Sequence, residues 1–271
     1  MTVRVEKNGN VWTIIHSRPE ARNAMDPQSA DDLTSAFLQF DADSSAHVAV
    51  FWGEGGAFCA GWDLKFVSTI DKNHPLEELD IPKGGGEHGN GSDIPRGPLG
   101  PSRLELDKPV IAAIAGPAVA GGMELALWSD FRVMEQSAYL GVYCRRWGVP
   151  LIDGGTVRLP RIVGQGRALE IILTGRQVMA KECEKLGLCE YVVSDGGARL
   201  KAEELAHEIA RFPQTCVRAD RRSAINQRNL NIRDALENEW YNGRDALIKD
   251  GINGASRFAG GLGRHGDFKE I

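Results

Sequence analysis

In four segments of the first 141 residues, hydrophobic residues are spaced as in β-strands. The segment VRVEKNGNVWTIIHS (3–17) contains two runs rich in β-branched residues around the turn sequence NGN, which predicts a hairpin. The apolar runs HVAVFWGE (47–54) and KPVIAAIAG (108–116) predict two buried strands. The segment FRVMEQSAYLG (131–141) predicts two short strands.

Helical spacing appears first in DPQSADDLTSAFLQFDAD (26–43). Asp26 is a suitable N-cap, and Pro27 suits the first helical position. Beyond Gly154 the pattern becomes mostly helical, with helices expected near 166–174, 180–187, 197–212, 216–228 and 231–250.

The two central strands belong to an internal repeat. VAVFWGEGGAFCAGWDL (48–64) aligns with PVIAAIAGPAVAGGMEL (109–125) at an offset of 61 residues. Both copies have a strand, a turn of small residues, and then Gly-x-acid-Leu opening a helix. This repeat predicts two stacked β–turn–α units whose loops gather on one side. It also predicts that Asp63 and Glu124 occupy equivalent places.

Residues 71–103 separate the two repeats and are rich in glycine and proline, with IPKGGGEHGNGSDIPRGPLGP at 81–101. That composition opposes regular secondary structure. Two interpretations stay open: a disordered surface loop, or a mobile flap beside a binding site.

Composition narrows the class of protein. The chain has 271 residues, 42% of them hydrophobic, and a net charge of −5 without a basic block, which argues against nucleic acid or an anionic membrane as the main partner. No apolar run approaches the roughly 20 residues that span a bilayer. The N-terminus has no apolar signal core, and the five cysteines include no C-x-x-C pair, so we expect a cytoplasmic protein with reduced thiols. The six histidines have no metal-ligand spacing, so we expect no metal.

Both turns of the repeat could present backbone N–H groups to an anionic oxygen, because each precedes a predicted helix start. The segment GEGGAFCAG (53–61) lacks the spacing of a nucleotide-binding loop, since Phe58 stands where the last glycine should be. Two such turns could together hold the oxygen of an enolate. Glu124 would then lie close enough to move a proton at the neighbouring carbon.

Each candidate residue also has a structural interpretation. Glu124 could simply complement the helix dipole, and Asp63 could cap its helix. Asp153, in the sequence DGGT, is interpreted first as an N-cap. Arg145 and Arg146 could be solvated or could pair with Asp153.

Several motifs in the same order resemble the crotonase superfamily, the enoyl-CoA hydratases and isomerases. The resemblance covers nearly the whole chain. The motifs are RPEARNAMD (18–26), AFCAGWDLK (57–65), KPVIAAIAGPAVAGGMELALWSDFRV (108–133), WGVPLIDGGTVRLPRIVG (147–164) and ILTGRQVMAKECEKLGLCEYVV (172–193).

The resemblance implies an α/β fold, a crotonase-like spiral of repeated ββα units. Residues 1–195 would form the spiral core with the acyl-CoA site, and residues 196–271 a helical C-terminal oligomerisation region. The chain would assemble as a homotrimer or a dimer of trimers. Its ligand would be a small-molecule acyl-CoA thioester, with no cofactor other than the coenzyme A of the substrate.

The resemblance also assigns site residues. Backbone N–H groups of Trp62 and Gly121 would form the oxyanion hole, and the bulk of Trp62 would narrow the acyl pocket. Glu124 matches the first catalytic glutamate of a hydratase. The positions that match the coenzyme A segments are Arg22, Ala60, Asp63, Leu64 and Lys65.

The chain departs from the hydratase pattern at the second glutamate, where it has Cys144. A thiol is a poor substitute for a carboxylate that orients water. Asp153 matches a position at which some relatives carry a functional aspartate.

Four functions therefore stay open. The family pattern favours hydration of a 2-enoyl-CoA through an oxyanion-stabilised enolate. A double-bond isomerase using Glu124 and Asp153 needs fewer groups. Asp153 could instead be the nucleophile of a thioester hydrolase, or the chain could be a non-catalytic acyl-CoA binding protein.

Overall fold

The predicted N-terminal hairpin is present as β1 (Val3–Asn8) and β2 (Val11–His16), paired antiparallel in the structure, a computed structural model. The structure describes residues 2–70, 76–81, 95–266 and 268. The helix expected next is α1 (Pro27–Ala42), and the Asp26 side chain accepts a hydrogen bond of 2.8 Å from the Ser29 N–H as predicted for an N-cap. Most of the glycine- and proline-rich stretch in 71–103 lies outside the described residues, so both interpretations of it stay predictions.

A six-stranded sheet carries the fold, in the order β1-β2-β3-β4-β6-β9, and every pair except β1·β2 is parallel. Its further strands are β3 (Val48–Gly53), β4 (Val110–Ile114), β6 (Phe131–Glu135) and β9 (Tyr191–Val193). Within the β3·β4 pair, Ala49 lies opposite Val110 and Phe51 opposite Ala112. Both pairs are 61 residues apart, so the strands of the predicted repeat are stacked in the predicted register.

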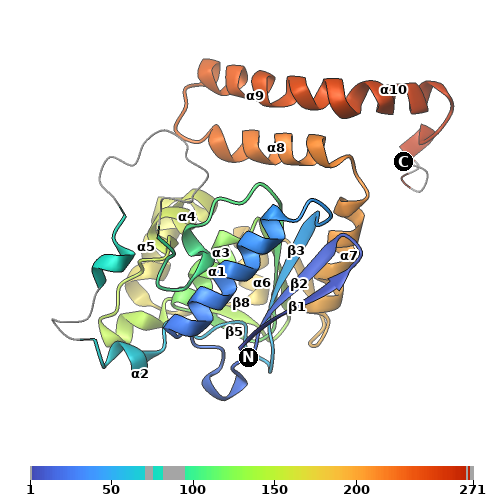
Figure 1. The fold of residues 1–271 in the computed structure, drawn as a ribbon. Helices are drawn as coiled ribbons and strands as arrows, with labels where there is room; N and C mark the ends of the chain where they lie inside the picture. Colours follow the sequence, from blue (N-terminus) through green and yellow to red (C-terminus); the bar gives the residue numbers. More distant parts are fainter. Residues whose placement is uncertain (1, 71–75, 82–94, 267, 269–271) are drawn as a thin grey trace.

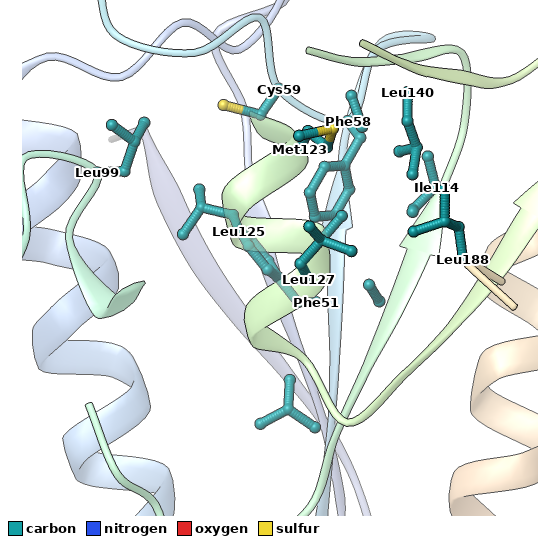
Figure 2. Close-up of a cluster of buried hydrophobic side chains, with 14 of the residues drawn as sticks. Phe51, Phe58, Cys59, Leu99, Ile114, Met123, Leu125, Leu127, Leu140 and Leu188 are labelled. Atoms are coloured by element: carbon teal, nitrogen blue, oxygen red, sulfur yellow. The ribbon is translucent and has the colours of Figure 1, made fainter. Parts of the chain in front are cut away.

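The two faces of this sheet are covered by different helices because strand side chains alternate in direction. Val48 and Val50 of β3 pack in a cluster with α7 (Ala198–Ala210). Ala49 and Phe51 face the larger core on the other side, with α1 and α3 (Gly121–Trp128). Figure 2 shows Leu125 and Leu127 of α3 among the side chains of this larger core, where the rings of Phe51 and Phe58 lie 4.9 Å apart.

A smaller sheet of β5, β7 and β8 lies beside the N-terminus of α3. Its strands are β5 (Pro117–Val119), β7 (Tyr139–Gly141) and β8 (Gln177–Met179). The segments around the site include two short helical turns, η3 (Pro101–Arg103) and η4 (Tyr143–Trp147), and the helices α2 (Leu64–Val67) and α4 (Gly155–Val163). The sequence pattern did not predict β5, β8 or β9, which have three residues each.

The C-terminal part is helical, as expected. It contains α5 (Gln165–Thr174), α6 (Ala180–Leu186), α7, α8 (Gln214–Asn226), α9 (Ile232–Ala246) and α10 (Ile252–Ala259). The helix expected over 231–250 changes at Ala246, because a π-helical turn, η5 (Leu247–Gly251), joins α9 to α10. Helix α7 packs on the sheet, whereas α8, α9 and α10 lie beyond one end of it (Figure 1). The boundary at 195/196 and the oligomerisation role stay predictions.

Among the described residues, no helix is both long and apolar enough to cross a bilayer. The same residues contain no group of three or more His, Cys, Asp or Glu side chains placed to hold a metal ion.

Candidate active site

A cavity of about 320 Å³ opens where the two repeated turns meet β7 and η4. All four residues predicted for catalysis line it: Trp62, Gly121, Glu124 and Asp153. The wall is mostly apolar and aromatic. Its other members are Arg22, Ala60, Leu64, Leu99, Pro117, Val119, Ala120, Tyr139, Tyr143, Cys144, Arg146, Trp147, Val149, Pro150 and Ile152.

The two turns are in direct contact, as the repeat predicted. A Cβ added to Gly61, whose φ is +92°, would lie 2.8 Å from Ala120 Cβ and 3.1 Å from the Gly121 nitrogen. Only glycine allows this approach, so Gly61 brings the Trp62 amide beside the start of α3. Within the described part of the chain, neither the Trp62 nor the Gly121 N–H donates a hydrogen bond. Two backbone donors therefore remain available at the cavity wall.

The residue before α3 is held in an unusual conformation. Ala120 has φ +54° and ψ −125°, a region that residues with a side chain rarely adopt. Its N–H donates to the Gly141 carbonyl at 2.8 Å, and its carbonyl accepts the N–H of Met123 at 3.0 Å. These bonds fix the peptide that presents the Gly121 amide, and strain of this kind is characteristic of functional sites.

Glu124 is buried, with 2% of its surface exposed, and does not face bulk solvent. Its Oε1 accepts the Asp153 N–H at 2.9 Å and the Gly155 N–H at 2.7 Å, whereas Oε2 accepts no hydrogen bond from the described residues. Burial, with a smaller contribution from the charge of Asp153, raises the pKa of Glu124 from 4.5 to about 7. The carboxyl group can therefore give or take a proton near neutral pH.

Asp153 is not an N-cap, so the first interpretation from the sequence is wrong. The N-cap of α4 is Gly154, and among the described residues no side chain caps that helix. The Asp153 carboxylate points into the protein instead, where Oδ1 accepts hydrogen bonds from the Leu99 N–H at 3.0 Å and from the Ser102 hydroxyl. Oδ2 is buried without a partner among the described residues. Burial raises the pKa of Asp153, and the hydrogen bonds from Ser102 and Leu99 oppose that rise.

Cys144, at the position of the second hydratase glutamate, also lines the cavity. It is buried, and burial together with the nearby charge of Glu124 raises the pKa of its thiol. The thiol therefore stays neutral at physiological pH. The neighbouring arginines do not pair with Asp153: Arg145 Nε donates to the Ile172 carbonyl, and the Arg146 guanidinium lies 4.8 Å from the centre of the Tyr143 ring.

The positions assigned to coenzyme A are only partly gathered at the cavity. Arg22, Ala60 and Leu64 line it, whereas Asp63 and Lys65 do not. The Asp63 side chain accepts the Lys65 N–H at 3.0 Å as the N-cap of α2, and it pairs with Arg18 at 3.2 Å. The capping interpretation of Asp63 is thus confirmed.

Asp63 and Glu124 do not occupy equivalent places, so this part of the repeat prediction is wrong. Asp63 stands before its helix, whereas Glu124 is the fourth residue of α3. Their environments differ for this reason: the first turn of α3 places Glu124 in a buried position at the cavity wall.

Three residues around Asp153 were not predicted. Leu99 and Ser102 come from the segment before β4, and Arg158 lies one turn into α4. Arg158 Nη1 donates to the Asp153 carbonyl at 2.9 Å, and its Nη2 donates to the Ser102 carbonyl at 2.7 Å. Asp153 and Arg158 are only five residues apart, but nothing in the sequence around Ser102 indicated that it meets either of them.

The arrangement suits chemistry at a carbon next to a carbonyl group. Two free backbone donors can bind one developing oxyanion. Two buried carboxyl groups, joined through the Asp153 N–H, lie on the same cavity and have raised pKa values. When two neighbouring acids have different pKa values, one can donate a proton while the other accepts one.

Comparisons with known proteins agree with this geometry. A family model described as enoyl-CoA hydratase/isomerase matches residues 6–78 and 102–250. The enoyl-CoA hydratase EchA19 of Mycobacterium tuberculosis is 34% identical over 226 residues, which cover 81% of this chain and 78% of the relative. Carnitinyl-CoA dehydratase of Salmonella typhi is 33% identical over 213 residues, covering 77% and 74%. The crystal structure of an enoyl-CoA hydratase from Mycobacterium tuberculosis H37Rv has a TM-score of 0.83 at 30% identity, covering 95% of both chains.

Proposed function

Because the chain belongs to the enoyl-CoA hydratase/isomerase family, we propose that it adds water to the double bond of a 2-enoyl-CoA thioester. One observation carries the proposal: Glu124 and Asp153 lie on the same cavity as two backbone amides that have no hydrogen-bond partner among the described residues. The names of the relatives support a hydratase-type acyl-CoA enzyme.

The Trp62 and Gly121 amides hold the thioester oxygen. As water attacks the β-carbon, electrons move toward that oxygen and an enolate forms. Its charge meets two oriented donors in a cavity lined mostly by apolar groups, where such donors are worth about 3 kcal/mol each. Both donors belong to the backbone, so the tryptophan side chain does not interfere with this role.

The two carboxyl groups divide the proton transfers. Glu124 keeps its proton up to about pH 7, whereas the two hydrogen bonds that Asp153 Oδ1 accepts favour the ionised form of Asp153, whose charge raises the pKa of Glu124. Asp153 Oδ2 takes the proton from water as the new C–O bond forms at the β-carbon. Glu124 then gives its proton to the α-carbon, and the proton on Asp153 returns to Glu124 through the site or solvent. Water is consumed and the enzyme is restored.

The coenzyme A part lies along the Arg22, Ala60 and Leu64 side of the cavity, with Asp63 and Lys65 on the adjoining segment. The chemistry requires no cofactor besides the substrate's own coenzyme A. The exposed apolar side chains of α8–α10 support assembly into a homotrimer or a dimer of trimers, and examples are Ile232, Trp240 and Ile252.

Cys144 favours a second candidate, a double-bond isomerase. A neutral thiol cannot replace the second glutamate, which orients water in a hydratase. Isomerisation needs only two proton transfers along the acyl chain. Asp153 would remove a γ-proton of a 2-enoyl-CoA to give a dienolate, and Glu124 would protonate its α-carbon, which yields the 3-enoyl-CoA. Hydrolysis with Asp153 as nucleophile is less well supported, because Oδ1 already accepts two hydrogen bonds from the protein.

Mass spectrometry of products in heavy water separates these functions. The protein is incubated with saturated, 2-enoyl, 3-enoyl and dienoyl thioesters, and Glu124→Gln is the control. A gain of water on the 2-enoyl substrate supports hydration, and deuterium uptake without water supports isomerisation. Free coenzyme A would contradict both, and binding without any product would indicate a non-catalytic acyl-CoA binding protein.

A further inference from the structure

The carboxylate of Asp153 is held from one side only. Both of its hydrogen bonds, from the Leu99 N–H and the Ser102 hydroxyl, reach the same oxygen, Oδ1. The other oxygen, Oδ2, is buried and has no partner among the described residues. A buried carboxylate oxygen without a donor is unusual, since such atoms are nearly always paired.

From this geometry we propose that Ser102 is a positioning residue for the reaction. Its hydroxyl fixes Asp153 Oδ1, keeps the carboxylate ionised, and leaves Oδ2 free to accept a proton from the reacting water. The proposal rests on the proposed function and extends it to a residue between the motifs that carry the family resemblance, which end at Lys65 and resume at Lys108. Ser102 does not line the cavity, so it acts through Asp153.

The hydroxyl of Ser102 is well fixed. Ser102 has 1% of its surface exposed and lies in η3, the short helical turn that precedes β4. Arg158 joins the two partners, because its guanidinium donates to the main-chain carbonyls of both Asp153 and Ser102, at 2.9 Å and 2.7 Å. One half-buried cation therefore ties η3 to the start of α4. Because Arg158 links the two backbone segments, the Ser102 hydroxyl stays within hydrogen-bond distance of Asp153 Oδ1.

Several charged or titratable groups face Asp153 from the elements around it. Glu124 on α3 accepts its N–H, Arg158 on α4 binds its carbonyl, Arg103 on η3 favours its charged form, and Cys59 is a buried thiol near enough to be affected by that charge. The cations and the Ser102 hydroxyl oppose the effect of burial. Among the described residues, only the Ser102 hydroxyl and the Leu99 N–H donate hydrogen bonds to the carboxylate itself.

Loss of the hydroxyl leaves the ionised carboxylate with one donor instead of two. Because a hydrogen bond to the charged form lowers the pKa of an acid, its removal raises the pKa of Asp153. Asp153 must be ionised to accept the proton of water, so activity at low pH falls. A hydrogen bond to a charged group is strong enough to move such a titration by about one pH unit.

The test is the pH dependence of kcat/KM for hydration, measured on the full chain for the wild type, Ser102→Ala, Ser102→Thr and Ser129→Ala. Ser129 is a matched control because it is a buried serine, 3% exposed, at the end of α3 and outside the cavity wall. In Ser102→Ala we expect the acid limb to move up by about one pH unit, with the limb near pH 7 unchanged. Ser102→Thr keeps a hydroxyl and should move the limb back toward the wild type, and Ser129→Ala should match the wild type.

Two failures are distinguishable. An active wild type and an equally active Ser102→Ala variant with the same acid limb would overturn the role of Ser102 and leave the hydratase proposal standing. An equal shift in Ser129→Ala would also overturn it, since the effect would then be a general one of lost buried hydroxyls. Absence of turnover in the wild type on the whole thioester panel would overturn the proposed function itself.

Discussion

Replacing Glu124 by glutamine should stabilise the folded protein at alkaline pH while removing its activity. The variant keeps the shape of the side chain, and its amide oxygen can still accept the Asp153 and Gly155 N–H groups that now bind Oε1. What it loses is a buried group that must ionise. Because the pKa of this group is raised in the folded protein, the group lowers the stability once the pH exceeds its unperturbed pKa of 4.5.

The magnitude follows from the raised pKa. The pKa of Glu124 is about 7 in the folded protein and 4.5 when unperturbed, a difference of about 2.5 units or ~3.4 kcal/mol. Because the folded-state pKa is the higher one, the unfolded chain releases its proton first, so stability falls as the pH rises from about 4.5 to 7. Between pH 5 and pH 8 the wild type should lose about 2.5 kcal/mol through this group, and Glu124→Gln should lose none of it.

Urea unfolding of both proteins at pH 5 and pH 8, at equal protein concentration, measures this difference. We expect similar stability at pH 5 and a variant that is more stable by about 2.5 kcal/mol at pH 8, together with a loss of kcat of roughly 10²–10⁴-fold. A variant that is less stable than the wild type at pH 8 would show that Glu124 is a satisfied structural carboxylate. A variant with wild-type kcat would refute its role in proton transfer.

Three further substitutions have outcomes that the structure predicts. Cys144→Glu adds a carboxyl group at the cavity wall and should raise the hydration rate roughly tenfold, measured as initial rate; an unchanged rate in a folded variant would count against that role for the position. Trp62→Ala keeps the backbone amide but removes the side chain that separates the 320 Å³ cavity from a 20 Å³ hollow beside Phe66. It should raise kcat/KM for longer acyl chains relative to a four-carbon one by about tenfold, and an unaltered chain-length preference would show that Trp62 is not the limit. In Gly122→Ala the new Cβ would overlap the Cys59 carbonyl oxygen, so the free energy of unfolding should fall by about 3 kcal/mol, and near-native stability in urea would contradict the close contact.

The strands and turns of the repeat could be predicted because their signals are local. Apolar runs predicted β3 and β4, and the 61-residue offset predicted which residues lie opposite each other. The repeat also predicted that the two turns gather on one side, and Gly61 lies against the start of α3 in the structure. These features can be predicted from a local pattern because each has a direct steric cause. Glycine allows a tight turn and close approach, and successive side chains along a strand point to opposite faces.

The surroundings of Asp153 could not be predicted because they depend on contacts between distant segments. The sequence DGGT has the form of a helix cap, yet Gly154 takes the N-cap position and Asp153 turns toward Ser102, 51 residues away in sequence. Asp153 and Arg158 are close in sequence, but no short-range pattern could relate either of them to η3. The departure at Cys144 was visible in the sequence, whereas the effect of Glu124 on its thiol required the fold.

Exchange of the α-hydrogens of a saturated acyl-CoA with solvent deuterium tests most directly whether two backbone amides and Glu124 act together on one thioester. This reaction needs only enolate formation and proton return, so it does not depend on whether the natural reaction is hydration or isomerisation. We predict that the wild-type protein incorporates deuterium at the α-carbon, detected by mass spectrometry, and that Glu124→Gln slows this exchange at least a hundredfold. Equal exchange by the two proteins, or none by the wild type when binding of the thioester is demonstrated, would contradict the assignment of the site.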